Sequence, residues 1–319
     1  MKHNSENDSK ASAVQQVRRT DAGRAFTLIE LLAILAVLAL LSCVLLPALA
    51  GAKMDVWRGQ CASNLRQLGI GFRLFEVDHN EMFPAAAYYS SNAPPRSGHL
   101  AWDSYLHRYI GGNGSDSNLL VGAWPVELTP KCEACPADVQ PKVWWIGNPP
   151  FNGIRSFAMV GVGPAWGTEY QVSSGSQQYR LPALHRGVGI YWADGGLPGT
   201  GLPDWDAKSY KTSVVKDAGG TILMVEEPNG QGAAGNIWPS ISCAPLGIGS
   251  LVQIDPDDGP PDPSAGVGVN LGKYTYQAHD KRFNYLFHDG HVAALRIEQT
   301  VGTGTRNAPG GMWTVAPDD

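Results

Sequence analysis

The stretch Phe26-Thr27-Leu28-Ile29-Glu30, followed by the apolar run LLAILAVLALLSCVLLPALA over residues 31–50, decides how this chain is organised. An apolar run of about twenty residues is long enough to cross the ~30 Å hydrocarbon core of a bilayer as a helix. Glu30 is a carboxylate inside this run, where a charged side chain costs roughly 2.5–3.5 kcal/mol on insertion scales. A residue of this kind is expected to be functional and to have a partner of opposite charge.

Residues 24–30, Arg-Ala-Phe-Thr-Leu-Ile-Glu, resemble the processing site of type IV prepilins and type II secretion pseudopilins. The resemblance implies that a prepilin peptidase cleaves between Ala25 and Phe26 and that the new amine of Phe26 is N-methylated. It also implies that Glu30 meets the N-terminal amine of a neighbouring subunit, which would offset the burial of its charge. The family prefers Gly before the cut, where this chain has the small Ala25. Pro47 resembles the proline that kinks pilin helices.

Two other processing sites compete with this interpretation. Leu40-Leu41-Ser42-Cys43 is a loose lipoprotein box, and Ala48-Leu49-Ala50 is a signal-peptidase-like site. A glutamate within the apolar run suits neither alternative, so we adopt the prepilin interpretation.

Basic residues just before the apolar run set its expected orientation. Because Arg18, Arg19 and Arg24 precede the span, the positive-inside rule places residues 1–25 in the cytoplasm as a leader peptide. We therefore expect a single-pass inner-membrane protein, with residues 26–46 in the membrane and residues 81–319 forming a periplasmic globular domain.

The apolar helix is expected to continue beyond the membrane, so that the N-terminal helix covers residues 26–80, running to about Asp78 and ending near Asn80. Apolar residues at spacings of three and four predict one buried stripe on it. The stripe comprises Met54, Trp57, Cys61, Leu65, Leu68, Phe72 and Phe75. Residues 61–69, CASNLRQLG, also resemble the segment after the span in a large pseudopilin-like group whose chains end in an H-x9-DG motif.

Composition and short apolar runs predict an α+β, pilin-like fold. The 319 residues include 38 Gly and 23 Pro, and only 17% are charged, which is typical of a loop-rich extracytoplasmic domain. A small antiparallel sheet is expected from strands at 154–162, 221–227, 283–287 and 291–296. The long, aromatic- and Gly-rich segments 163–210 and 228–272 are expected to be loop insertions, and residues 302–319 a loose tail.

Cysteine spacing leaves several possibilities open. Cys132 and Cys135 form a C-x2-C that could be half a zinc site, a redox pair or a disulfide. No second C-x2-C supplies zinc ligands, and a periplasmic location favours a structural disulfide. The bridge is expected to be Cys132–Cys135, or one of these with Cys243. Residues 131–138 also resemble a Cys-Pro box of the family, in which one cysteine often has a distant partner.

The C-terminal strands are joined by Asp289-Gly290, which favours a two-residue type I′ hairpin. That turn would pair His288 with His291 and Phe287 with Val292. We then expect one face of the hairpin to meet the helix stripe, namely the face carrying Phe283, Tyr285, Phe287 and Val292.

His279, Asp289 and Gly290 together match the H-x9-DG motif of the pseudopilin-like group. A metal site formed by His279, His288, Asp289 and His291 is one interpretation, because mixed nitrogen and oxygen ligands suit zinc. We adopt the structural alternative, in which Asp289 accepts local backbone donors and His279 fixes the preceding loop by hydrogen bonding. Glu226, which follows an apolar strand, is expected to be capped or solvated.

The function implied by the resemblance is that of a structural subunit of a type II secretion pseudopilus or a related pilus. Its expected partners are the prepilin peptidase, other pseudopilin subunits and an inner-membrane assembly platform. The net charge of −5 does not suggest nucleic-acid binding. The alternative is a membrane-anchored carbohydrate- or peptide-binding module that uses the aromatic-rich insertions.

No enzyme motif is found, and no cofactor is expected. The acidic stretch Asp255–Asp262 could bind calcium, although its spacing does not match an EF-hand loop.

Overall fold

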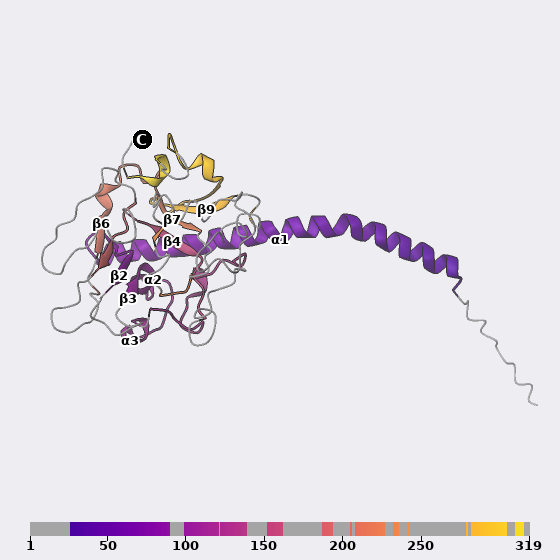
Figure 1. Ribbon diagram of the computed structural model, residues 1–319, viewed down its shortest axis with the longest axis horizontal. Helices are drawn as coiled ribbons and strands as arrows, with labels where there is room; N and C mark the ends of the chain where they lie inside the picture. The colour runs from indigo at the N-terminus through magenta and orange to yellow at the C-terminus, as the bar shows by residue number, and fades with distance from the viewer. Residues whose placement is uncertain are drawn as a thin grey trace, which may run out of the picture. The chain divides into compact units, whose positions relative to one another are not determined.

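A computed structural model describes residues 26–89, 99–120, 122–138, 152–161, 187–193, 205, 208–226, 232–235, 241–242, 279, 282–304 and 310–315. The chain divides into two units, residues 1–50 and 51–319, which are considered separately below. Helix α1, Leu28–Asp78, belongs to both (Figure 1). It ends at Asp78, three residues after Phe75, the last residue of the predicted apolar stripe.

The main sheet of residues 51–319 has five strands in the order β10-β9-β7-β4-β8. Their bounds are β4 Phe157–Val160, β7 Ile222–Glu226, β8 Ile241–Ser242, β9 Phe283–Phe287 and β10 Val292–Leu295. All neighbours are antiparallel except β4 and β8, which are parallel. Together with α1, these strands make the fold α+β, and four of them fall within the predicted strand ranges.

Shorter strands, helices and turns precede, connect and follow the strands of the main sheet. Two small sheets pair β1 with β6, and β2 with β3 and β5. The strands are β1 Met82–Pro84, β2 Ala87–Tyr89, β3 His99–Ala101, β5 Tyr191–Ala193 and β6 Lys208–Lys211. Helices α2 and α3 are Trp102–Leu106 and Asp116–Leu119. The 3₁₀ turns are η1 Lys131–Glu133, η2 Thr212–Val214, η3 Ile297–Gln299 and η4 Gly311–Trp313.

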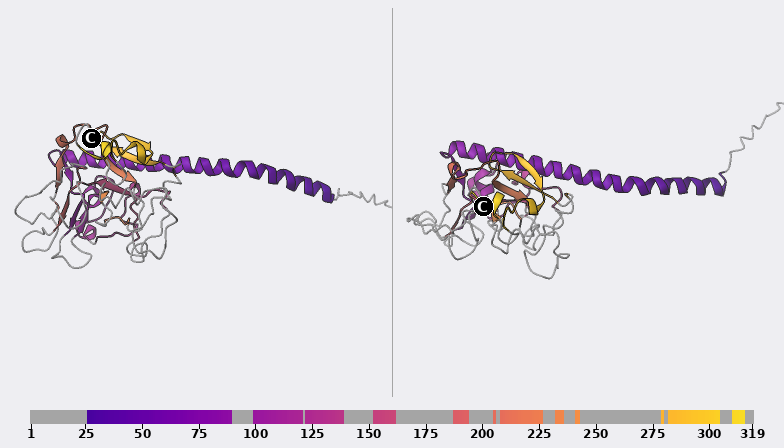
Figure 2. Two further views of the ribbon diagram at one scale, coloured as in Figure 1. Left: turned by 45° about the horizontal axis from the view of Figure 1, so that its top comes forward. Right: turned by 90° about the horizontal axis from the view of Figure 1, so that it is seen from above.

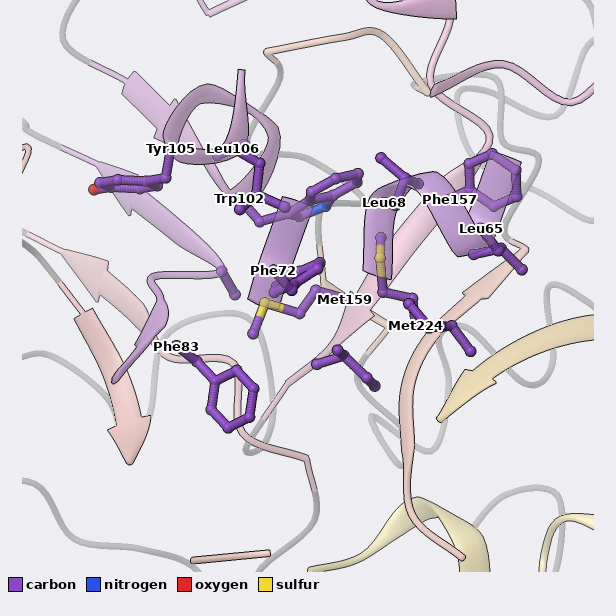
Figure 3. Close-up of a cluster of buried hydrophobic side chains, with 14 of the residues drawn as sticks. Leu65, Leu68, Phe72, Phe83, Trp102, Tyr105, Leu106, Phe157, Met159 and Met224 are labelled. Carbon is purple, nitrogen blue, oxygen red and sulfur yellow. The ribbon is translucent and has the colours of Figure 1, made fainter. Parts of the chain in front are cut away.

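The C-terminal half of α1 packs against the main sheet, and the right-hand view of Figure 2 shows the helix running along one side of the strands. The predicted stripe is confirmed from Cys61 to Phe75, where its five apolar side chains are at most 2% exposed. Figure 3 shows Leu65, Leu68 and Phe72 in one cluster with side chains of α2, β4 and β7.

Two glycines on the buried face of α1 allow this close approach. A Cβ atom at Gly69 would lie 3.0 Å from Leu286 of β9, and one at Gly71 would overlap the side chain of Ile110. Each glycine weakens a helix by about 1 kcal/mol relative to alanine. Glycine is nevertheless suited to these two positions, because a larger side chain would collide with Leu286 or Ile110.

The hairpin register differs from the prediction by one residue. Val292 pairs with Leu286 and Ala293 with Tyr285, so the loop contains His288, Asp289 and Gly290. The Gly290 amide donates to the Phe287 carbonyl over 2.9 Å, and Gly290 has φ = +93°. A type I turn followed by a left-handed glycine makes a three-residue hairpin loop.

The face of the hairpin that meets α1 is therefore also different. Leu286 and Val292 pack in the cluster with α1, whereas Phe283, Tyr285 and Phe287 pack in a second cluster on the opposite face. Both faces of β9 are buried, so its hydrophobic pattern could not indicate which face meets the helix.

The second cluster is covered by the C-terminal segment, which was expected to be a loose tail. Trp313 is fully buried, lies edge-on to Tyr285 at 6.0 Å between ring centroids, and donates its indole N–H to Thr300 over 2.9 Å. The prediction of a loose tail is therefore wrong for residues 310–315, because they cover the apolar face of the hairpin that does not meet α1.

Candidate functional site

Residues 26–50 form an exposed apolar helix surface. Every residue from Phe26 to Ala50 is exposed, and α1 is the one helix in the described part of the chain that is long and apolar enough to span a membrane. Over residues 28–46 a helix rises about 28 Å, close to the thickness of the hydrocarbon core. Pro47 lies inside α1 without ending it.

Glu30 lies in the first turn of α1, in a reciprocal hydrogen-bonded arrangement with Thr27. Its carboxylate accepts from the Thr27 backbone N–H over 2.9 Å and from the Thr27 hydroxyl over 2.8 Å, and the Glu30 amide donates to that hydroxyl over 3.3 Å. This is a capping box, in which the residues three apart satisfy each other's free amides. The T-x-x-E spacing is visible in the sequence and was missed. Ala25, on the other side of the expected cleavage site, lies outside the described residues.

A disulfide joins Cys61 of α1 to Cys135 of the Cys-Pro box. The predicted Cys132–Cys135 bridge is wrong, because Cys135 is bonded to Cys61 and Cys132 is a free buried thiol. Burial and the nearby Glu133 raise the pKa of the Cys132 thiol to about 12. Cys243 lies outside the described residues. The box is held against α1 a second time, by the Asn64 side-chain amide, which donates to the Ala134 carbonyl over 2.8 Å. Asn64 and Cys61 are three residues apart and so lie on one face of the helix.

His279, the first residue of the H-x9-DG motif, lies directly beside this disulfide. Its Nε2 is 3.6 Å from the Cys135 sulfur, and its Nδ1 is 3.0 Å from the Glu226 carboxylate. Glu226 also accepts two hydrogen bonds from Asn284, from the backbone N–H over 2.8 Å and from the side-chain amide over 2.9 Å. Glu226 is therefore capped by protein donors, one of the two outcomes expected for it.

The cluster of Cys61, Cys135, Glu226 and His279, called the Cys–His–Glu cluster below, is isolated from solvent. The four side chains are at most 3% exposed. A carboxylate, an imidazole and a sulfur in this order could activate a cysteine nucleophile. Here the sulfur is bonded to Cys61 and is not a free thiol, so the geometry does not favour nucleophilic catalysis.

The other residues of the predicted metal site lie elsewhere. Asp289 accepts from the His291 backbone N–H over 2.9 Å and lies 2.6 Å from His291 Nδ1, on an exposed turn. His288 is buried edge-on against Phe83, and burial lowers its pKa to about 3. Among the described residues, the group of His, Cys, Asp and Glu atoms suited to a metal is the Cys–His–Glu cluster. Of the four residues of the predicted metal site, this cluster contains only His279.

A second buried polar cluster links α2 to the start of β4. Arg155 and Asp103 form an ion pair of 2.7 Å, both at most 1% exposed, and the Gly235 amide donates to the same Asp103 oxygen over 2.7 Å. Burial, together with the charge of Asp103, raises the pKa of the neighbouring Glu133 well above its usual range. Fully buried groups of this kind connect loops, and breaking such a pair is strongly destabilising.

Comparisons with known proteins return no matching family model, no matching curated protein and no matching solved structure.

Proposed function

We propose that this chain is a pseudopilin-like structural subunit, matured by cleavage between Ala25 and Phe26 and assembled through its N-terminal helix into a periplasmic filament. The observation that carries the proposal is the exposed apolar helix surface of residues 26–50 with Glu30 in its first turn. An apolar surface of this size must be covered by lipid, by other helices or by both.

The proposed role of Glu30 requires its charge. In the assembled state its carboxylate pairs with the methylated amine of Phe26 in a neighbouring subunit, which makes the burial of both charges tolerable. Before assembly, the capping box with Thr27 satisfies the same carboxylate. One residue then serves two successive partners.

The mature N-terminus tests the maturation step. Mass spectrometry of membrane-extracted protein is expected to give an N-terminal peptide that begins with N-methylated Phe26. A lipidated Cys43 would instead indicate a lipoprotein, and a start at Gly51 would indicate a soluble exported protein; either result overturns the proposal.

The Glu30→Gln variant tests the assembly step. Glutamine can replace glutamate in a capping box, so the helix start should be preserved while the charge is lost. We expect normal cleavage and membrane insertion, but loss of filament formation. Cross-linking between cysteines on the helices of neighbouring subunits should be lost as well. Thr27→Val is the matched control, because it removes the capping hydroxyl and keeps the charge; it should assemble. Equal assembly of Glu30→Gln and the unmodified chain would contradict the proposed pairing.

The alternative, an anchored carbohydrate- or peptide-binding module, depends on aromatic residues of segments 163–210 and 228–272. Half of these aromatic residues lie outside the described residues, and no geometry among the described ones favours this alternative.

A further inference from the structure

We propose that the Cys–His–Glu cluster becomes a zinc site when the Cys61–Cys135 disulfide is reduced. The ligands are the two thiolates and Nε2 of His279, and Glu226 positions the histidine from its other nitrogen. The inference concerns residues outside the exposed apolar part of α1, residues 26–50, and does not depend on filament assembly.

The distances in the cluster match the requirements of zinc. One ligand atom from each of its four side chains lies within 4.8 Å of all the others. With Zn–S near 2.3 Å and Zn–N near 2.0–2.1 Å, a tetrahedral angle places the nitrogen and the sulfur roughly 3.6 Å apart. The observed separation between His279 Nε2 and Cys135 Sγ is 3.6 Å. Nitrogen and sulfur are thus already spaced as two ligands of one ion.

The histidine is held in the orientation that metal binding requires. The Glu226 carboxylate already accepts two hydrogen bonds from Asn284, and it lies 3.0 Å from His279 Nδ1. Because a carboxylate oxygen accepts, we assign a proton to Nδ1, and Nε2 is then the ring nitrogen directed at the sulfur. A carboxylate that accepts from the distal nitrogen of a metal-binding histidine is the usual outer partner of such a ligand.

The position of Glu226 is itself fixed by α1. The Asn284 side-chain amide donates to the Arg58 backbone carbonyl over 3.2 Å as well as to Glu226. Because Arg58 is three residues from Cys61, one turn of α1 sets the place of both a ligand and the residue that orients another ligand.

Reduction creates the demand for a cation. A dithiol reductant supplies two electrons and two protons to the disulfide, forms its own disulfide, and leaves Cys61 and Cys135 as thiols that can move apart. Zinc binding then releases the two thiol protons, because the thiolate is the ligand. Two buried thiolates without a cation would be strongly unfavourable. Soft thiolates and an imidazole select zinc over calcium or magnesium, and a water molecule fills the fourth position, as in other three-ligand sites.

The test uses the full chain in detergent micelles, with zinc and cobalt as probes. Oxidised protein should bind no zinc at this cluster. After reduction by a phosphine we expect one zinc per chain, measured by competition with a chromogenic chelator, and cobalt should give sulfur-to-metal charge-transfer absorption. Cys132→Ser is the matched control and should bind as the unmodified chain does, because Cys132 is a buried thiol outside the cluster.

Variants of the cluster separate ligand from positioning roles. His279→Ala keeps both cysteines, so its fold can be checked in the oxidised state by circular dichroism before reduction; it should then lose zinc binding. Glu226→Gln should keep the stoichiometry of one but bind about 10- to 100-fold more weakly. Equal zinc binding by His279→Ala and the unmodified chain would overturn the inference, as would loss of binding in Cys132→Ser. It also fails if the reduced chain binds no zinc, or if reduction unfolds the domain and zinc does not restore it.

Discussion

Removing the Cys61–Cys135 bridge should lower the free energy of unfolding of residues 51–319 substantially. The bridge joins residues 74 positions apart. In the chain-entropy treatment, closing a loop of this length lowers the entropy of the unfolded chain enough to stabilise the folded state by about 4 kcal/mol. The change to make is Cys61→Ala with Cys135→Ala, in the presence of a metal chelator.

The assay is urea unfolding of the full chain in micelles, followed by the fluorescence of buried tryptophans such as Trp102 and Trp313. The double variant should unfold at a lower urea concentration, by an amount equivalent to a few kcal/mol. Reducing the unmodified chain in the same buffer should give a similar loss, and Cys132→Ala should lose only about 1 kcal/mol for a small buried side chain. If the double variant changes by less than Cys132→Ala, the reasoning from the bridge is refuted.

Three further predictions test other parts of residues 51–319. Gly71→Ala should destabilise the domain by roughly 1–2 kcal/mol, because the new methyl group overlaps Ile110. Gly59→Ala is the control: it has open space around it and should stabilise the domain by up to about 1 kcal/mol. Equal effects of the two variants in thermal melts would contradict the packing argument. His288 is neutral in the folded domain down to a pKa of about 3, but in the unfolded chain it is protonated below about 6.5. Its contribution to stability is therefore lost as the pH falls from 6.5 towards 3, and unfolding free energies at pH 8 and pH 5 should differ by about 2 kcal/mol more in the unmodified chain than in His288→Phe. Trp313→Ala should cost about 3–5 kcal/mol in denaturant unfolding; a change near zero would show that the C-terminal segment does not cover the hairpin.

Local patterns were sufficient for the long helix and for the positions of the main strands. The stripe from Cys61 to Phe75 has the period of an α-helix. This period predicts a helix with one buried face, regardless of which element packs against that face. The class α+β followed from the same patterns, as did the presence of a hairpin at Asp289-Gly290.

Patterns failed where two solutions were locally equivalent. Asp-Gly is compatible with a two-residue loop and also with a three-residue loop that has glycine at its left-handed position. The structure has the second, because Leu286 then meets α1 at Gly69 while Tyr285 meets Trp313. A shift of one residue in register reverses which side chains face the helix, and no neighbour in the sequence shows which face will be covered by residues 310–315.

The sequence by itself determined the features whose cause is local: an apolar run long enough to span a membrane, a carboxylate near its start, and an amphipathic helix beyond it. Only the tertiary structure decided that Cys135 bonds to Cys61, 74 residues away, and that His279 and Glu226 lie beside that bond. The physical reason is that a disulfide, a hydrogen bond or a metal site depends on distances of a few ångströms between side chains. Those distances are set by how the sheet packs on α1, and separation along the chain carries no information about them.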